Sequence, residues 1–100
     1  MILLTKENRA ALPALYAQDG KGDNAIAYVK FFTPWTGWTW YAMEFDGQDT
    51  FFGLVHGVEE ELGYFSLREL ETLQGPAGLK IERDLHFKPT ALKELRQRVV

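Results

Sequence analysis

The chain contains no cysteine, which excludes disulfide bonds and thiolate metal sites. Its two histidines, His56 and His86, do not have the spacing of a zinc-binding or metalloprotease motif. Because few good ligands are left, we expect no structural or catalytic metal and no cofactor. Folding is then expected to depend on side-chain packing alone.

Long hydrophobic runs are also missing. No apolar stretch approaches the roughly 20 residues that cross a bilayer, and the apolar residues 1–4 lead directly into a charged segment, residues 6–9. We therefore expect no membrane segment, and the default location is the cytoplasm. A length of 100 residues is enough for one hydrophobic core, so residues 1–100 are expected to form a single domain.

Basic charge is scarce in the middle of the chain. The net charge of the whole chain is only −3, but residues 44–71 contain eight acidic residues against one basic residue, Arg68, a net charge of −7. Nucleic-acid binding needs a basic face for phosphate contacts, so this distribution argues against a nucleic-acid partner. The acidic segment can steer a basic protein partner and accelerate its association. The alternative is that these carboxylates form only a solvated face of the protein.

Three apolar runs between Ala25 and Gly57 organise the predicted fold. Two turn sequences separate them: residues 33–37, TPWTG, place a proline where a tight turn begins, and residues 46–49, DGQD, contain an Asp-Gly pair. The pattern predicts three strands in an antiparallel meander. Their expected bounds are residues 25–33, 38–45 and 50–56.

The alternation of side chains along paired strands predicts which residues share a face of this sheet. One face is expected to carry Tyr41, Met43, Phe45, Phe52 and Leu54. Of these, Tyr41, Phe45, Phe52 and Leu54 are expected to be mostly buried. The other face is expected to carry Trp38, Trp40, Ala42, Glu44, Phe51, Gly53 and Val55. Both faces are substantially apolar. Either other elements cover both of them, or the tryptophan face is partly open as a binding surface.

Short helices are predicted before and after the meander in the sequence. Thr5 can cap a helix that ends near Leu12, before Pro13. Ser66 and Glu69 have the spacing of a capping box at the start of a second helix, in which leucines 67, 70 and 73 form the inward stripe. Residues 64–65, just before it, are predicted to be a short fourth strand or an extended approach to the helix.

The C-terminal third of the chain has a mixed pattern. Residues 79–87 alternate between apolar and charged side chains as in a strand. A last helix is predicted from Thr90 or Ala91 to about Arg98, with Leu92, Leu95 and Val99 as its apolar stripe. The fold class is therefore predicted to be α+β: a three- to four-stranded antiparallel meander sheet packed with two or three short helices.

Five stretches of the sequence carry a family resemblance. They are LTKENRAALPALYAQ, YVKFFTP, WTWYAMEFDGQDTFFGLVHG, ELGYFSLRELETL and GPAGLKIERDLHFKP. Together they resemble the bacterial domain-of-unknown-function family 2958, over nearly the whole chain. The resemblance implies a small bacterial protein, of a kind often met on plasmids and other mobile elements, with no established activity. It transfers no catalytic or binding positions.

The leading functional hypothesis is a non-enzymatic interaction or modulator domain whose partner is another protein. Aromatic side chains supply apolar anchors in such interfaces, and the acidic residues can steer a basic partner. The candidate interaction surface consists of Trp35, Trp38, Trp40, Glu59, Glu60, Glu61 and Tyr64.

Two alternatives stay open at the level of sequence. The first is a small hydrolase-like or metal-dependent enzyme that uses His56 and nearby carboxylates. A separate candidate for acid–base chemistry is the group of carboxylates Glu44, Asp46 and Asp49 around the second turn. The second is a single-strand nucleic-acid binder that stacks bases on the tryptophans, which needs adjacent Lys or Arg. No residue is assigned as catalytic, because turn aspartates and surface histidines have ordinary structural roles.

Overall fold

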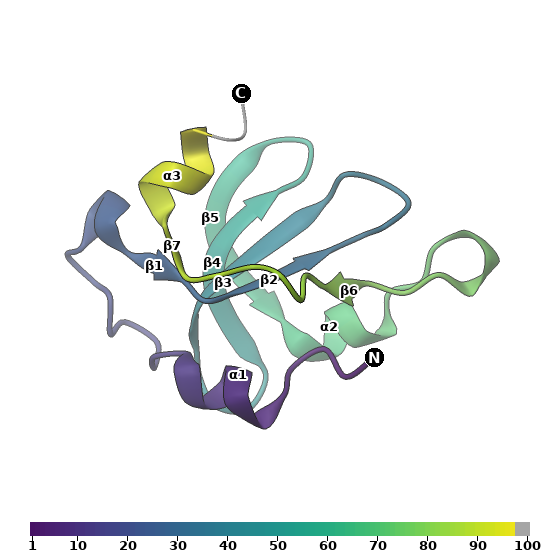
Figure 1. The fold of residues 1–100 in the computed structure, drawn as a ribbon, viewed down its shortest axis with the longest axis horizontal. Helices are drawn as coiled ribbons and strands as arrows, with labels where there is room; N and C mark the ends of the chain where they lie inside the picture. Colours follow the sequence, from purple (N-terminus) through teal and green to yellow (C-terminus); the bar gives the residue numbers. More distant parts are fainter. Residues whose placement is uncertain (98–100) are drawn as a thin grey trace.

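A five-stranded antiparallel sheet forms the centre of the fold (Figure 1), which the computed structural model describes for residues 1–97. Its strands lie in the order β5-β4-β3-β2-β6, and β1 and β7 form a separate two-stranded sheet. The strands are β1 (Ile26–Ala27), β2 (Val29–Phe32), β3 (Thr39–Phe45), β4 (Thr50–His56), β5 (Glu60–Ser66), β6 (Glu82–Arg83) and β7 (Thr90–Ala91). The α-helices are α1 (Lys6–Ala11), α2 (Leu67–Thr72) and α3 (Leu92–Gln97). The predicted α+β class is confirmed, and the sheet has more strands than expected.

The turn between β3 and β4 forms as its sequence predicts. Gly47 has a φ of 88°, a left-handed conformation that favours glycine. The Asp46 side chain accepts hydrogen bonds from the backbone N–H groups of Gln48, Asp49 and Thr50, at 2.8–3.0 Å. This aspartate therefore closes the turn with its own side chain, which is why a short local sequence is enough to specify the hairpin.

A β-bulge in β3 changes which residues share a face. Tyr41 pairs with Leu54 as expected, but the register shifts between Ala42 and Glu44, so that Phe45 pairs with Phe51. One extra residue in a strand moves every later side chain to the opposite face. The expected pairing of Phe45 with Phe52 on one face is therefore wrong.

The burial of these rings follows the shifted register. Phe51 is fully buried and Phe45 is 4% exposed, whereas Phe52 is only half-buried. Tyr41, Phe45 and Leu54 are buried in the core as expected, whereas Phe52, also expected to be mostly buried, is only partly buried and lies outside the core.

Other elements cover both faces of the sheet. On one face, α2, the N-terminal segment and Ile81 pack on the sheet and enclose a cluster rich in aromatic rings. Its buried members are Leu3, Leu4, Leu12, Val29, Phe31, Trp40, Ala42, Phe45, Phe51, Leu67, Leu70 and Ile81. The Trp35 ring packs against this cluster and is only partly buried, so the tryptophan side is covered in part.

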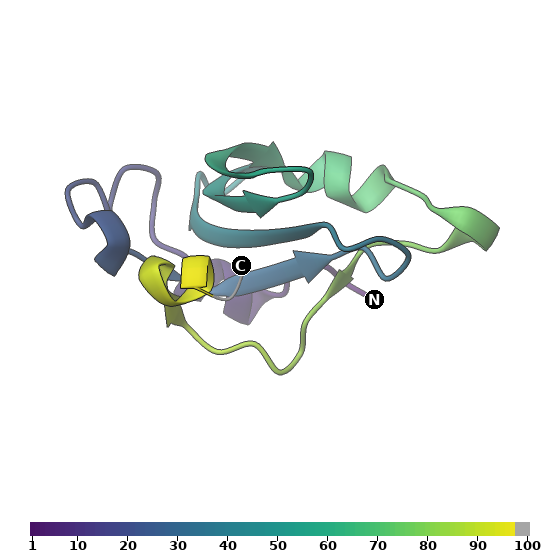
Figure 2. The same ribbon diagram turned by 90° about the horizontal axis from the view of Figure 1, so that it is seen from above.

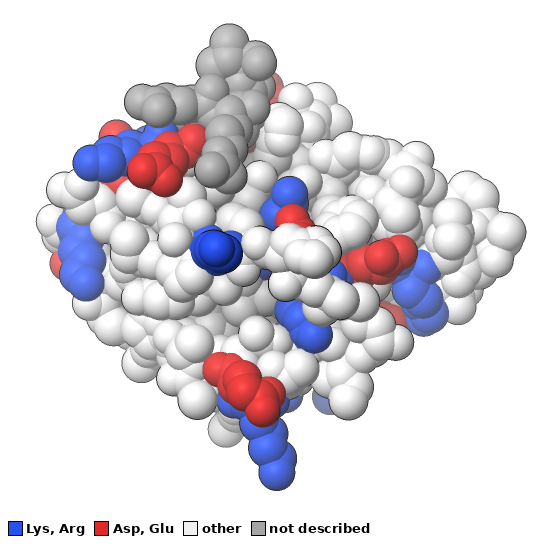
Figure 3. Space-filling view, in the orientation of Figure 1, with Lys and Arg blue, Asp and Glu red and all other residues white. Residues whose placement is uncertain are grey.

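The opposite face is covered by α3 and by the small β1-β7 sheet (Figure 2). The buried cluster there consists of Ala25, Ala27, Tyr41, Met43, Leu54, Leu92 and Leu95. On this side, Lys and Arg groups are interspersed with Asp and Glu groups (Figure 3).

The first predicted strand, residues 25–33, is divided into β1 and β2. In β2, Val29 pairs with Ala42 of β3, next to the bulge. The two residues of β1, Ile26 and Ala27, pair with β7 instead of β3. The Gln18 side chain fills the gap: it accepts from Ile26 N (2.7 Å) and donates to the carbonyl oxygens of Ile26 (2.8 Å) and Met43 (2.9 Å). The bulge therefore interrupts the ladder that a continuous strand would need.

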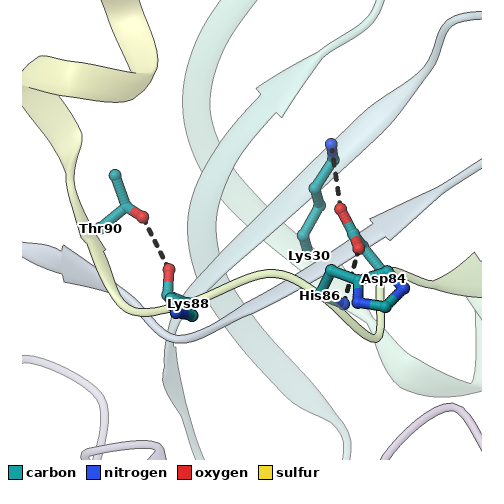
Figure 4. Close-up of polar contacts among 5 residues, drawn as sticks. All are labelled: Lys30, Asp84, His86, Lys88 and Thr90. Atoms are coloured by element: carbon teal, nitrogen blue, oxygen red, sulfur yellow. Dashed lines mark hydrogen bonds and ion pairs between the residues drawn. The ribbon is translucent and has the colours of Figure 1, made fainter.

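The alternating residues 79–87 form a strand only at β6. Asp84 ends it, because its Oδ1 accepts from His86 N at 2.9 Å and turns the chain, while its Oδ2 lies 3.5 Å from Lys30 Nζ (Figure 4). In the last helix, α3 begins at Leu92, close to the predicted start. The predicted Arg98 and Val99 lie outside the described residues.

Candidate functional site

The hairpin that joins β2 to β3 brings the three tryptophans to one side of the sheet. Trp40 is 7% exposed and Trp38 is 40% exposed, and their ring centroids are 5.8 Å apart. Trp35 lies half-buried in the turn itself. Thr33 N donates to the Trp38 carbonyl oxygen (3.0 Å), and Trp38 N donates to Thr36 Oγ1 (3.1 Å). These hydrogen bonds hold the turn in which the aromatic side chains are presented.

Two glycines lie directly against the tryptophan rings. A Cβ atom on Gly57, just after β4, would be 2.5 Å from the Trp38 ring, and one on Gly75, beyond α2, would be 2.3 Å from the Trp35 ring. Real Cβ atoms do not approach so closely, so each ring is seated on a glycine backbone. The two rings therefore have positions that depend on segments far from them in sequence.

A groove of about 250 Å³ opens between these rings and the end of α2, and we call it the Trp groove. Its lining residues are Thr33, Trp35, Thr36, Trp38, Trp40 and Leu73. Leu73 was predicted to point inward with Leu67 and Leu70, but it is 40% exposed while they are buried. Because α2 ends at Thr72 and Leu73 has extended backbone, with ψ of 129°, its side chain leaves the inward stripe.

The register of β5 separates the three consecutive glutamates. Glu61 pairs with Val55, which pairs with Trp40, so Glu61 lies on the tryptophan face. Glu60 pairs with His56 and points to the opposite face, where its Oε1 is 3.8 Å from Arg96 Nε. In the turn before β5, the carbonyl oxygen of Glu59 accepts from Gly57 N at 3.1 Å.

Tyr64 lies apart from the Trp groove. It pairs with Phe52 across β4 and β5, on the face opposite the tryptophans, with 5.1 Å between the two ring centroids. A hydrogen bond with Tyr16 raises the pKa of Tyr64 above its ordinary value. Of the candidate surface, the structure thus places the three tryptophans and Glu61 on one face, with Glu59 in the turn before β5, and places Glu60 and Tyr64 on the other face.

The histidines do not converge with carboxylates into a ligand set. His56 lies between Thr39 and Glu60 in the ladder, and His86 is in the turn that Asp84 closes. Within residues 1–97, no group of three or more His, Asp or Glu side chains is placed to hold a metal ion.

Glu44, which the sequence placed among the carboxylates around the turn, is instead buried against the segment between α1 and β1. Glu44 is 3% exposed, and its two oxygens accept from Tyr16 N (2.8 Å) and Gln18 N (2.9 Å). Gln18 is itself 5% exposed. Because backbone donors occupy both carboxylate oxygens, we interpret Glu44 as a structural tie between this loop and β3. Its partners are more than 25 residues away in sequence, so no local signal could have found them.

Asp49 connects the β3-β4 turn to the start of α2. Its carboxylate accepts from Ser66 Oγ (2.6 Å) and Arg68 N (2.8 Å), and its carbonyl oxygen accepts from Leu67 N (2.8 Å). Ser66 caps the helix, because its Oγ accepts from Glu69 N at 3.2 Å, but within residues 1–97 the reciprocal hydrogen bond of the predicted capping box, from Ser66 N to the Glu69 side chain, is absent. The hydrogen bond from the Ser66 hydroxyl, followed by that from Arg68 N, lowers the pKa of Asp49.

This lowered pKa predicts a pH dependence of stability. A carboxyl whose pKa is lower in the folded state stabilises the fold above its unfolded pKa, and that contribution is lost as the pH falls through the folded value. Asp49→Asn is therefore expected to reduce the free energy of unfolding at neutral pH, with the difference from the parent shrinking below about pH 4.

Urea unfolding at neutral and acidic pH measures this difference. Asp19→Asn is the control, because Asp19 is exposed and its side chain forms no hydrogen bond or ion pair within residues 1–97. A difference for Asp49→Asn that stays constant as the pH falls would contradict the assigned role of the carboxylate.

Comparison with known proteins identifies one family. The family model described as "Protein of unknown function (DUF2958)" matches residues 3–95. No curated protein and no solved structure matches the chain. None of the helices in the described part of the chain is long and apolar enough to cross a membrane.

Proposed function

The chain belongs to the DUF2958 family of proteins of unknown function, and from this starting point we propose that it is a non-enzymatic protein-interaction domain that binds its partner through the Trp groove. The proposed partner is another protein in the cytoplasm. The family resemblance implies an association with mobile elements, which is consistent with a domain that modulates this partner protein.

The observation that carries this proposal is the exposure of large apolar side chains around one preformed groove. Trp38 and Leu73 are each 40% exposed and lie next to the partly buried Trp35. Tryptophan is enriched among the residues that contribute most to binding energy in protein interfaces. The Trp35 ring packs on the backbone of Gly75 and the Trp38 ring on that of Gly57, so both rings are positioned before any partner binds. This reduces the entropy lost on association.

The surroundings of the groove favour a protein partner over single-stranded nucleic acid. None of the six lining residues is basic, and Glu61 lies on the same face. Base stacking on aromatic rings is ordinarily accompanied by Lys or Arg that contact the phosphates. The enzyme alternative based on His56 has no observation in its favour, since Glu60, its neighbour in the ladder, is paired with Arg96.

Truncation of Trp38 tests the proposal. With a partner captured from the native host and then purified, Trp38→Ala is expected to weaken binding about 30-fold, the effect of losing about 2 kcal/mol at an interface hot spot. Isothermal titration calorimetry measures the two affinities, and circular dichroism checks that the variant is folded.

Tyr64→Ala is the matched control, because Tyr64 is a 57% exposed aromatic residue on the opposite face. It is expected to leave the affinity unchanged. If Trp38→Ala binds as tightly as the parent, or if Tyr64→Ala alone loses affinity, the Trp groove is not the partner surface.

A further inference from the structure

The shape of the Trp groove limits the kind of segment that can occupy it. At about 250 Å³ it is smaller than typical small-molecule sites of about 300–1,000 Å³. It opens at the β2-β3 turn and the end of α2, whereas an added strand pairs with a free sheet edge. The groove is therefore suited to one or two side chains of an extended segment.

The tryptophans of the groove carry hydrogen-bond donors that such a segment could use. Within residues 1–97, the indole N–H groups of Trp35 and Trp40 have no hydrogen-bond acceptor. No buried side-chain nitrogen in this part of the chain lacks a partner, so both N–H groups are accessible to solvent. The indole group can only donate, so a ligand that presents free carbonyl oxygens matches these two donors.

A polyproline II segment has these properties. It forms no internal hydrogen bonds, so its carbonyl oxygens remain available, and its extended conformation exists before binding. Proline-rich segments of this kind dock in grooves lined by aromatic side chains. The Trp38 ring is 40% exposed and lies 5.8 Å from the buried Trp40 ring, so it offers an apolar surface for a proline ring.

The charges near the groove are acidic on two sides. Exposed Glu61 lies on the tryptophan face, and exposed Glu59 is in the turn next to Gly57, on which the Trp38 ring rests. Across the groove, exposed Glu69 lies one helical turn before Leu73. The carbonyl oxygen of Glu69 accepts from Leu73 N at 3.1 Å. Complementary charge on a ligand would be positive.

Building on the proposed function, we propose that the Trp groove binds an extended, proline-containing segment of the partner protein in the polyproline II conformation. A Lys or Arg next to the prolines faces Glu59 and Glu61. The prolines contact the indole rings, and carbonyl oxygens of the segment accept from the Trp35 and Trp40 N–H groups.

Synthetic peptides test this proposal directly. The probe is a short peptide with a Pro-x-x-Pro core flanked by arginine, titrated while tryptophan fluorescence is recorded. Peptides with alanine in place of proline, or glutamate in place of arginine, are each expected to bind at least about tenfold more weakly. Added sodium chloride is expected to weaken binding of the arginine peptide, because it screens exposed charges.

Variants of the protein locate the binding site. Trp38→Ala is expected to abolish binding. If this variant does not fold, Gly57→Ala replaces it in the test, because the added Cβ atom must displace the Trp38 ring. Glu61→Gln is expected to weaken binding of the arginine peptide about threefold. Glu60→Gln is expected to have no effect, because Glu60 faces the opposite side of the same strand.

The outcomes separate this inference from the proposed function. If no proline peptide binds, but a partner captured from the host still depends on Trp38, the polyproline inference is overturned and the interaction function stands. Binding of the alanine peptide as tightly as the proline peptide overturns the inference as well. Trp38-dependent binding of oligo-dT, or Trp38-dependent self-association in sedimentation, would also overturn it.

Discussion

Replacing Phe51 with alanine is expected to lower the free energy of unfolding by about 3–5 kcal/mol. Phe51 is fully buried, and its ring is stacked between Phe45 and Phe65, with centroid distances of 4.5 and 5.1 Å. Phe31 approaches it at 5.6 Å. Truncation would leave a cavity among three rings that cannot all move into it, because they belong to three strands, β2, β3 and β5, that are fixed by pairing in the sheet.

Phe52→Ala is the matched control for this prediction, since the two phenylalanines are adjacent in β4 but point to opposite faces. Phe52 is half-buried, so its truncation is expected to cost only about 1–2 kcal/mol. Equilibrium urea unfolding of both variants measures the two losses. A larger loss for Phe52→Ala than for Phe51→Ala would mean that β3 has no bulge and that the regular alternation holds.

The second large effect is expected at Gly53, where the sheet has no room for a side chain. Gly53 pairs with Ala42 at the bulge, and a Cβ atom would lie 1.9 Å from the carbonyl oxygen of Tyr41. Because that oxygen belongs to the backbone, relief requires the central strands to separate. Gly53→Ala is therefore expected to destabilise the fold by more than about 4 kcal/mol, among the largest effects of single substitutions.

Gly63→Ala provides the control for Gly53→Ala. Gly63 is the register partner of Gly53 on β5, and a Cβ atom there would meet nothing within 4 Å. Thermal unfolding followed by circular dichroism is expected to show a nearly parental midpoint for Gly63→Ala and a folded population reduced or lost for Gly53→Ala. Equal midpoints for the two variants would refute the close approach of the backbone.

Features that depend on local interactions could be predicted from the sequence. The Asp46-Gly47 turn, the Thr5 cap of α1 and the Ser66 cap of α2 each involve partners within four residues. Alternation of side chains also predicted the pairing of Tyr41 with Leu54 correctly. These features depend on backbone conformations and hydrogen bonds that neighbouring residues alone can satisfy.

The candidate site could be predicted only in part. The three tryptophans stand out in the sequence as a cluster, but Gly57 joins them from the end of β4, and Leu73 and Gly75 join them from the segment after α2. The glutamate run 59–61 looks continuous in sequence, whereas pairing of β5 with β4 sends its members to different faces. Nothing in the order of residues indicates which of these glutamates lies on the tryptophan face.

The sequence by itself determined the turns, the helix caps and the existence of an antiparallel meander. Only the tertiary structure decided where the bulge lies, which phenylalanine enters the core and which residues form the Trp groove. The physical reason is that one extra residue opposite Gly53 inverts the facing of every later side chain in β3. That residue is accommodated through Gln18 and Glu44, whose hydrogen-bond partners are distant in the chain.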